Sequence, residues 1–278
     1  MKIINKKPEW FEFDKNSSVE KNPPKSFIHI KFDSVVQWYK YLKEYKPEQG
    51  TWLSSQKISN DMWSGSRTWD DYLEILDTGD KELMNKIKKE TQKQVKIMEK
   101  KYEKQIVAYK FDVIGEQFDI GLVLSGVPEV WLEPIEEEVE APKIELKLNM
   151  GTSSRTSFDD IINNASKVLS MLMILDEMGY QTKLTAYTLS VGYDYADSSK
   201  CIILENAVKD YDEPINFNKV SVYLSPTHLR RGSFAVREQM ADDLNSGYGM
   251  TINSKGLVRI SEDEQVKELE KKLFGGAK

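Results

Sequence analysis

The segment 225–237 carries the side chains best suited to bind an anion. His228 lies beside Arg230 and Arg231, and Arg237 follows further along the same predicted helix. Paired guanidinium groups at a helix start can hold phosphate or carboxylate in a bidentate manner, with help from free backbone amides. The alternative is structural: the two adjacent arginines form salt bridges to Glu238 or to the acidic run at 136–140.

A second candidate is the loop that follows the apolar strand pattern at 144–148. Residues 144–178 resemble a von Willebrand factor A type domain, whose first loop carries an Asp-x-Ser-x-Ser metal-adhesion motif. At the matching positions Asn149 replaces the carboxylate, Gly151 replaces one hydroxyl, and Ser153 keeps the last. Because Mg²⁺ prefers hard oxygen donors that include a carboxylate, we predict no metal and no cofactor here. We expect a tight turn whose amides cap a helix.

Other chemical signals in the chain are weaker. The lysines between residues 86 and 104 could contact a nucleic-acid backbone, but glutamates are interleaved with them, as in a solvated helix with i to i+4 ion pairs. Asp194 and Asp197 lie in a Gly-, Ser- and Tyr-rich segment where Asp favours turn geometry. His29 and His228 are the chain's two histidines, which disfavours a histidine-rich metal site. No phosphate-loop, dinucleotide-binding or zinc-protease motif occurs.

Composition limits the class of protein. The 278 residues are 40% hydrophobic, enough to bury a core, and the net charge of −6 does not attract nucleic acid or an anionic membrane. Cys201 is the single cysteine and cannot form an intramolecular disulfide. No apolar run reaches the length of a membrane span. These features predict a reducing, cytoplasmic setting without membrane contact.

The first half of the chain has mixed local patterns. We expect an irregular arm over 1–25, with Trp10, Phe11 and Phe13 packed on the protein, and then a strand at 27–32. Asp33 or Ser34 can cap a helix that runs to Tyr45. Thr68 and the residues after it form a capping box for a helix that ends at 79. A second helix begins at 80, and strands are expected at 107–113 and 118–122.

The second half predicts a strand–helix–strand unit. The predicted elements are a strand at 144–148, a helix from Ser157 to 178 and a strand at 183–191. In such a unit the two strands lie parallel in one sheet and the helix connects them. We further expect a hairpin that leads to a strand at 201–204, a strand at 220–224, a helix after Pro226 and a terminal helix at 262–274. The fold class is α/β with a mixed α+β N-terminal part, and a Rossmann-like von Willebrand A-type sheet with flanking helices follows.

We expect three parts in the chain. They are an arm over 1–25, an α+β portion with the Lys/Glu-rich helix over 26–140, and a von Willebrand A-like domain over 141–278. The acidic run that closes at Pro142 marks the boundary between the last two.

Short motifs between 60 and 250 resemble an uncharacterised family of tailed-bacteriophage proteins. The resemblance implies a viral origin, location in the host cytoplasm or association with the virion, and no assigned chemistry. The motifs are Trp63-Ser64-Gly65, Gly126-Val127-Pro128-Glu129, Leu229-Arg230-Arg231-Gly232-Ser233-Phe234 and Gly247-Tyr248-Gly249.

These observations favour a non-enzymatic binding or assembly protein that contacts a protein partner, which is a second copy, a virion component or a host protein. The many Trp and Tyr residues suit such interfaces. One alternative is a nucleic-acid or nucleotide-binding protein or enzyme that uses His228 and the arginines on phosphate. The other is an acidic inhibitor of a host factor.

Overall fold

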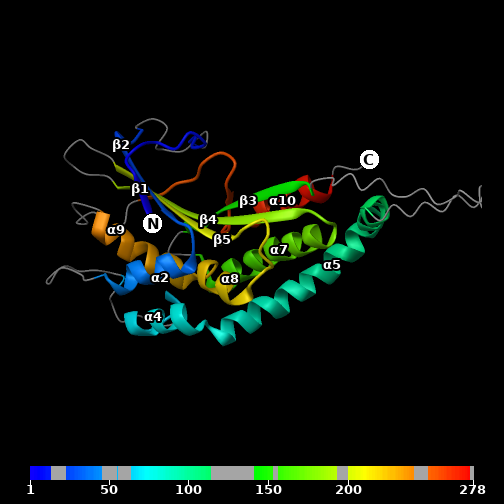
Figure 1. The fold of residues 1–278 in the computed structure, drawn as a ribbon, viewed down its shortest axis with the longest axis horizontal. Coiled ribbons are helices and arrows are strands. Elements are labelled where there is room, and N and C mark those ends of the chain that lie inside the picture. Colours follow the sequence, from blue (N-terminus) through cyan, green and yellow to red (C-terminus); the bar gives the residue numbers. More distant parts are fainter. Residues whose placement is uncertain are drawn as a thin grey trace, which may run out of the picture.

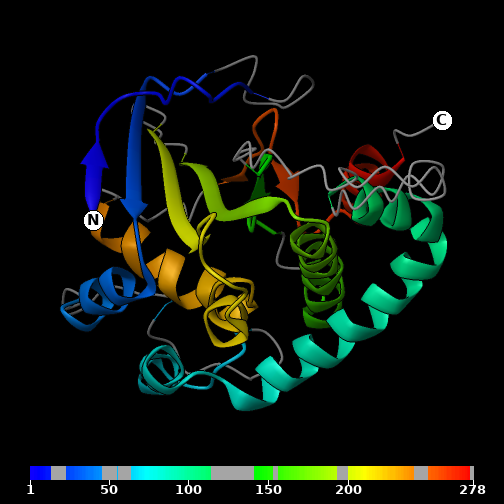
Figure 2. The ribbon, with the colours of Figure 1, turned by 45° about the vertical axis from the view of Figure 1, so that its right-hand side comes forward.

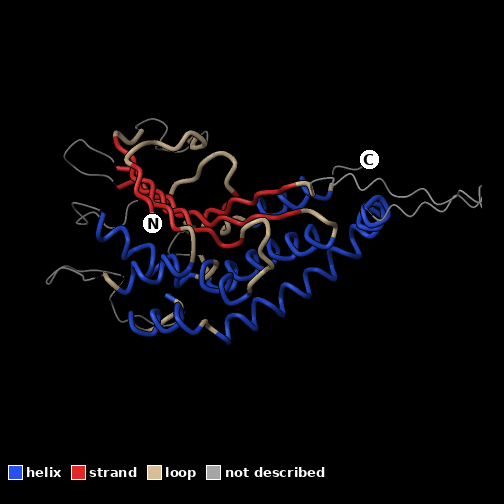
Figure 3. The backbone as a smooth tube through the Cα atoms, in the orientation of Figure 1, coloured by secondary structure: helices blue, strands red, loops and turns tan. Residues whose placement is uncertain are grey.

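The computed structural model describes residues 1–13, 23–45, 55, 64–113, 141–152, 156–192, 200–240 and 250–275 (Figure 1). Seven strands form one mixed sheet in the order β1-β2-β5-β4-β3-β7, with β6 paired to β4. Helices form a layer on one face of this sheet, so the fold is α/β (Figure 3). In the part of the chain that is described, no helix is both long and apolar enough to cross a membrane.

The strand–helix–strand unit predicted in the second half is confirmed. β3 (Lys143–Asn149) pairs in parallel with β4 (Gln181–Gly192), and α7 (Phe158–Glu177) connects them. β5 (Lys200–Lys209) then pairs antiparallel to β4, as expected for a hairpin. The short strands β6 (Met250–Thr251) and β7 (Val258–Arg259) pair with β4 and β3 respectively.

The N-terminal strands belong to the same sheet. β2 (Ser26–Phe32) pairs in parallel with β5 over its whole length, and β1 (Lys2–Ile4) pairs antiparallel to β2 at the edge. The boundary expected at 140 therefore does not separate two sheets. The main apolar core likewise takes residues from both sides of it, such as Trp38 and Leu172.

Helices from the whole chain cover one face of the sheet (Figure 2). α2 (Val35–Lys43) packs on α4 (Trp69–Thr78), β2 and β5, while α5 (Lys81–Val113) lies along α7 and α8 (Phe217–Tyr223). A π-helix, η1 (His228–Ser233), continues into α9 (Phe234–Met240), and α10 (Asp263–Phe274) packs on α7 and β7.

The opposite face carries a smaller apolar cluster. Phe11 is buried there with Leu189, Val191 and Ile203, and Trp10 packs against the cluster. The backbone of Glu12 accepts a hydrogen bond from the amide of Lys255 at 2.9 Å, which holds residues 8–13 beside 252–257. The expected packing of the arm's aromatic residues is confirmed for Trp10, Phe11 and Phe13.

Local sequence signals fix the helix starts. Ser34, Thr68 and Ser157 each accept the backbone amide three residues ahead, and Thr68 forms a complete capping box. Asn216 caps α8 through its side-chain oxygen. The prediction of a strand in this region missed this cap.

Three expectations about elements are wrong. Residues 1–25 contain β1, because Ile3 and Ile4 add to the edge of β2. Residues 107–113 continue α5, since this short apolar run follows a Lys/Glu-rich helix without a Gly or Pro to end it. Residues 220–223 lie in α8, where Val220 to Tyr223 are all buried. When a helix is buried on several sides, its apolar residues are not spaced with the helical period, so the sequence does not indicate a helix. The strand expected at 118–122 lies outside the described residues.

Gly232 permits close packing of η1 on α2 and α4. A Cβ at this position would overlap the hydroxyl of Tyr72 and lie 2.5 Å from Cζ2 of Trp38. Both side chains are fully buried, and Trp38 Nε1 donates to the Tyr72 hydroxyl at 3.0 Å. Neither ring can move aside without breaking this bond.

We expect Gly232→Ala to lower the free energy of unfolding by about 1–3 kcal/mol, because overpacking forces this contact apart. Urea denaturation monitored by tryptophan fluorescence measures the change. Asn85→Ala, on the exposed side of α5, serves as the control and should stay within about 0.5 kcal/mol of wild type. Equal stability of the two variants would contradict this packing.

Candidate functional site

The four residues predicted to bind an anion lie close in the chain but beneath the surface. His228, Arg230 and Arg231 are in η1, Arg237 is in α9, and each is 3% exposed or less. A bound anion would have to enter the protein interior. Anion binding at this cluster stays a prediction, and the contacts of the side chains favour the structural alternative.

Arg231 organises the segment that precedes α4. Its Nε donates to the hydroxyl of Ser66 at 2.7 Å, and its terminal nitrogens donate to the carbonyl oxygens of Ser55, Ser66 and Arg67 at 2.6, 2.8 and 2.8 Å. The planar guanidinium thus joins two separate segments to η1. These acceptors are neutral oxygens. The salt bridges predicted from sequence, to Glu238 or to the acidic run at 136–140, stay a prediction, and that run lies outside the described residues.

Glu238 supports the same region from α9. Its carboxylate accepts the Tyr45 hydroxyl at 2.6 Å and the Ser55 amide at 3.1 Å. Arg231 and Glu238 therefore both hold Ser55, one through its carbonyl and the other through its amide.

The other two arginines also contact protein groups. A terminal nitrogen of Arg230 donates to the carbonyl of Thr156 at 3.2 Å, and burial lowers the pKa of this guanidinium. The guanidinium of Arg237 lies 5.9 Å from the ring centre of Phe234.

His228 is a neutral core residue. Its ring lies 4.7 Å from that of Trp38 and 5.0 Å from that of Tyr223, and burial lowers its pKa to about 3. The amide nitrogen of Asn206 lies 3.3 Å from Nε2. A neutral imidazole adds no positive charge for an anion.

The loop after β3 is held by its own side chain. The amide nitrogen of Asn149 donates to the carbonyl of Ile252 at 2.7 Å and to Asn253 Oδ1 at 2.9 Å, while Asn149 Oδ1 accepts the amide of Gly151 at 2.9 Å. Asn149 thus ties the end of β3 to the segment after β6. Ser153 lies outside the described residues. Among the described residues, no group of three His, Cys, Asp or Glu side chains could hold a metal.

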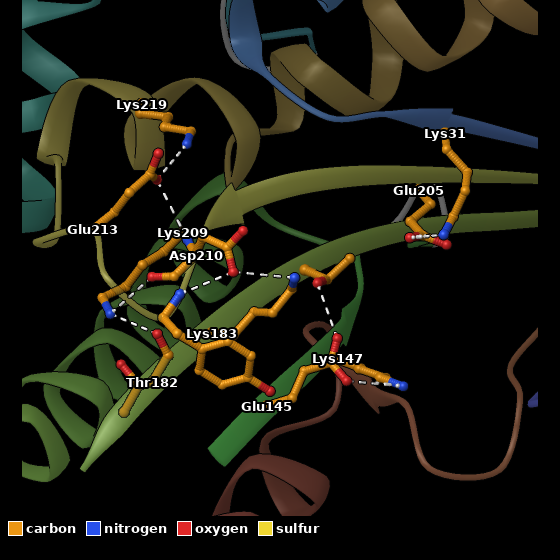
Figure 4. Close-up of polar contacts among 12 residues, drawn as sticks. Lys31, Glu145, Lys147, Thr182, Lys183, Glu205, Lys209, Asp210, Glu213 and Lys219 are labelled. Carbon is orange, nitrogen blue, oxygen red and sulfur yellow. Dashed lines mark hydrogen bonds and ion pairs between the residues drawn. The ribbon is translucent and has the colours of Figure 1, made fainter. Parts of the chain in front are cut away.

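A charged belt crosses the sheet face opposite the helices, where lysines pair with carboxylates (Figure 4). Lys147 pairs with Glu145 along β3 at 3.1 Å, and Lys183 of β4 pairs with Asp210 at 3.2 Å. The belt consists of Lys31, Glu145, Lys147, Lys183, Glu205 and Asp210. Because each of these pairs is partly exposed, each adds little stability.

The most buried part of the belt is centred on Glu205. Although burial opposes ionisation, hydrogen bonds from His29 at 2.7 Å and Lys31 at 2.9 Å keep the pKa of Glu205 below its ordinary value. Burial and the nearby carboxylate of Glu205 raise the pKa of Tyr187. Trp10 packs against the rings of Tyr187 and His29. This part of the belt attaches the N-terminal arm to the sheet.

These groups do not form a nucleophile with its base. Burial raises the pKa of Cys201 to about 12 and that of Tyr187 also rises, so both side chains stay protonated near neutral pH. The carboxylate of Glu205 is engaged by His29 and Lys31.

An exposed apolar surface lies at the edge of the sheet. Ile3 in β1 is 44% exposed and Val36 in α2 is 73% exposed. The amino group of Met1 donates to the side chain of Gln37 at 2.7 Å, which places β1 next to α2. We call Met1, Ile3, Val36 and the outer side of β1 the binding edge. No strand from the described ranges pairs with that outer side.

A family model described as a domain of unknown function (DUF7192) matches residues 17–272. The chain belongs to the DUF7192 family. No curated protein and no solved structure matches it significantly. The DUF7192 match runs across residue 140 and includes β2 together with β3, β4 and β5, the strands that share one sheet.

Sequence reasoning missed the binding edge and the pairing around Glu205 in this DUF7192 chain. The two β-branched residues Ile3 and Ile4 were a signal for a strand. The contact of His29 and Lys31 with Glu205 depends on the parallel pairing of β2 and β5, for which the sequence has no local signal.

If Arg231 is structural, its removal should unfold the DUF7192 domain more easily. We expect Arg231→Ala to cost about 3 kcal/mol, because several buried oxygens lose a charged donor, and Arg231→Lys to recover only part of this. Arg67→Ala is the matched control, since its side chain is exposed and its carbonyl still accepts from Arg231. Denaturant unfolding measures all three. An Arg231→Ala variant as stable as the control would refute the structural role.

The neutral His228 predicts acid sensitivity. In the unfolded chain histidine takes up a proton below pH 6.5, whereas in the folded protein burial lowers the pKa of His228 to about 3. Between these two pH values the unfolded state therefore binds more protons than the folded state. The free energy of unfolding decreases as the pH is lowered, by about 2 kcal/mol from pH 8 to pH 5. Carboxylates with lowered pKa, such as Glu205, lose their contribution at lower pH.

His228→Gln should flatten this dependence above about pH 5, whatever its effect on absolute stability. Chemical denaturation at several pH values compares the slopes for wild type and variant. In the wild type, the NMR signals of the His228 ring should not titrate in this range. Identical slopes, or a ring that titrates near pH 6.5, would count against the buried neutral histidine.

Proposed function

We propose that this protein is a non-enzymatic binding protein that acts through protein–protein contacts at the binding edge. β1 is the terminal strand of the sheet order, and the Met1 amino group bonds to Gln37 of α2, whose neighbour Val36 is exposed. An edge strand presents a row of backbone donors and acceptors to another chain. An extended segment of a protein partner can add to it as a further strand.

The side chains of the binding edge support an apolar contact on the helical side. Ile3 is opposite Ile30, which lies in the main core, so Ile3 points toward the face that the helices cover. Val36 is exposed on α2 at the same end of the sheet. A partner strand would cover both with the apolar residues of one of its faces.

The charges favour an acidic partner segment on the other side. Lys2 is directly opposite Lys31 in the pairing of β1 with β2, and like charges at such positions disfavour each other. Glu205 compensates Lys31 at 2.9 Å. An Asp or Glu on a strand added beside β1 would compensate Lys2. The expected partner segment therefore alternates apolar and acidic residues.

The resemblance to tailed-bacteriophage proteins supports a viral origin, with the partner in the host cytoplasm or the virion. The parallel β3–α7–β4 unit supports a von Willebrand A-like arrangement in which Asn149 bonds to the chain instead of a metal. Both assignments are part of the proposal.

Peptide display on the immobilised full-length protein tests the binding edge. Selected peptides should alternate apolar and acidic residues, and fluorescence anisotropy should show that Ile3→Lys and Val36→Lys each weaken binding about tenfold, because an apolar contact is lost. Ile97→Lys is the matched control, since Ile97 is 51% exposed on α5, away from the edge.

Failure to select any peptide would overturn the proposal, as would equal weakening by all three variants. A dimer of the protein that dissociates in Ile3→Lys and Val36→Lys, but not in Ile97→Lys, would identify a second copy as the partner.

A further inference from the structure

The helix α5 lies on the outside of the helix layer (Figure 1, Figure 2). It packs on α7 and α8, which themselves pack on strands of the sheet. Its described side chains run from residue 81 to residue 101, about 30 Å along the helix axis. Leu83, Ile87 and Met98 are buried on the inner side of the helix. The opposite side of α5 faces solvent over its described length.

This solvent side of α5 is basic. Residues 81–101 include eight lysines and three glutamates, a net charge of +5 in a chain whose net charge is −6. Because an α-helix turns by about 100° per residue, five exposed lysines fall within about one third of its circumference, opposite Leu83 and Ile87. We call these five residues the basic face: Lys81, Lys88, Lys89, Lys96 and Lys100.

The charge of the basic face is not neutralised within α5. None of its five lysines forms an ion pair or a hydrogen bond with a described residue. Glu82 and Glu99 lie on the same side of the helix, which leaves an excess of three positive charges there. Glu90, the third glutamate, is engaged by Lys93 at 3.3 Å.

Acidic residues of the neighbouring helices are engaged by other lysines of α5. Asp159 of α7 pairs with Lys86 at 2.6 Å, and Glu270 of α10 pairs with Lys101 at 2.7 Å. At physiological salt, exposed charges that lie more than about 8 Å apart are largely screened from each other. The negative net charge of the whole chain therefore does not exclude a polyanion from the basic face.

We propose that the basic face of α5 binds the phosphate backbone of double-stranded DNA. Lysine ammonium groups neutralise phosphates and release counterions, which gives an affinity that does not depend on base sequence. Lys81, Lys88 and Lys96 follow one another at intervals of about 10 to 12 Å along the helix, close to the width of the major groove of B-DNA. Lysines at this spacing can reach phosphates on both sides of that groove.

Other anionic partners fit the basic face less well. The exposed side chains described on α5 include no aromatic ring on which an unpaired base could stack, which disfavours single-stranded nucleic acid. A helix that lies on a membrane needs a broad free apolar side, whereas the apolar side of α5 is packed on α7 and α8. Ile97 is the one large apolar side chain exposed on the described part of α5, which is too little to anchor an acidic protein.

Fluorescence anisotropy of a labelled DNA duplex of about 20 base pairs, titrated with the full-length protein at several salt concentrations, tests this site. Two duplexes of unrelated sequence should bind equally. The logarithm of the association constant should fall linearly with the logarithm of the salt concentration, with a slope of about −3 to −5, because each neutralised phosphate contributes about −0.9.

Lys88→Gln combined with Lys96→Gln should weaken binding about tenfold at low salt and make the slope shallower by about two, because two phosphate contacts are lost. Lys40→Gln combined with Lys43→Gln makes the same change of charge on the exposed side of α2 and should leave affinity and slope unchanged. Glu99→Gln should tighten binding about twofold, since a repelling carboxylate is removed from the same side of α5.

Circular dichroism checks that the variants fold. If the first double variant does not, chemical acetylation of the wild type gives the same answer: bound duplex should protect Lys88 and Lys96 but not Lys40 and Lys43, as measured by mass spectrometry.

The proposal is overturned if duplex DNA does not bind saturably at low salt, or if both double variants weaken binding equally. It is also overturned if single-stranded DNA, duplex RNA or anionic vesicles bind and duplex DNA does not. The Lys88 and Lys96 double variant should keep the wild-type affinity for peptides at the binding edge, so the two proposed surfaces can fail independently.

Discussion

The parallel pairing of β2 with β5 determines where the binding edge lies and which side chains surround Glu205. Seven consecutive residues of β2 are in register with seven of β5, from Ser26 opposite Lys200 to Phe32 opposite Asn206. This pairing leaves β1 at the edge of the sheet and places His29 and Lys31 beside Glu205. It also places the start of β2 beside the start of β5. Residues 8–13 have a second attachment, because the amide of Lys255 donates to the carbonyl of Glu12.

The residues with the most suggestive chemistry serve the interior instead. The guanidinium of Arg231 bonds to carbonyl groups of two segments, and the imidazole of His228 is held neutral between Trp38 and Tyr223. Buried polar groups need partners, and such partners fix the geometry around them. These side chains therefore define how η1 packs on the sheet and on α4. The exposed apolar side chains belong to less conspicuous residues, such as Ile3 and Val36.

Local elements with strong signals could be predicted from the sequence, whereas the relations between distant segments could not. The strand–helix–strand unit followed from apolar periodicity and the Ser157 cap. The segment at 220–223 was mistaken for a strand because its helix is buried on several sides. The pairing of residue 26 with residue 200 has no local cause, so neither the strand order nor the edge position of β1 was foreseen. Arg231 and His228 are buried by residues that are distant in the sequence, such as Ser66 and Trp38, so their burial could not be predicted either.

Amide hydrogen exchange of the full-length protein tests the pairing of β2 with β5 most directly. The amides of β2 that bond to β5 are expected to exchange as slowly as those in the middle of β4 and β5, because opening them requires global unfolding. Rapid exchange throughout 26–32, with β3, β4 and β5 still protected, would show that the N-terminal segment is not a stable part of the sheet and would contradict the position of the binding edge.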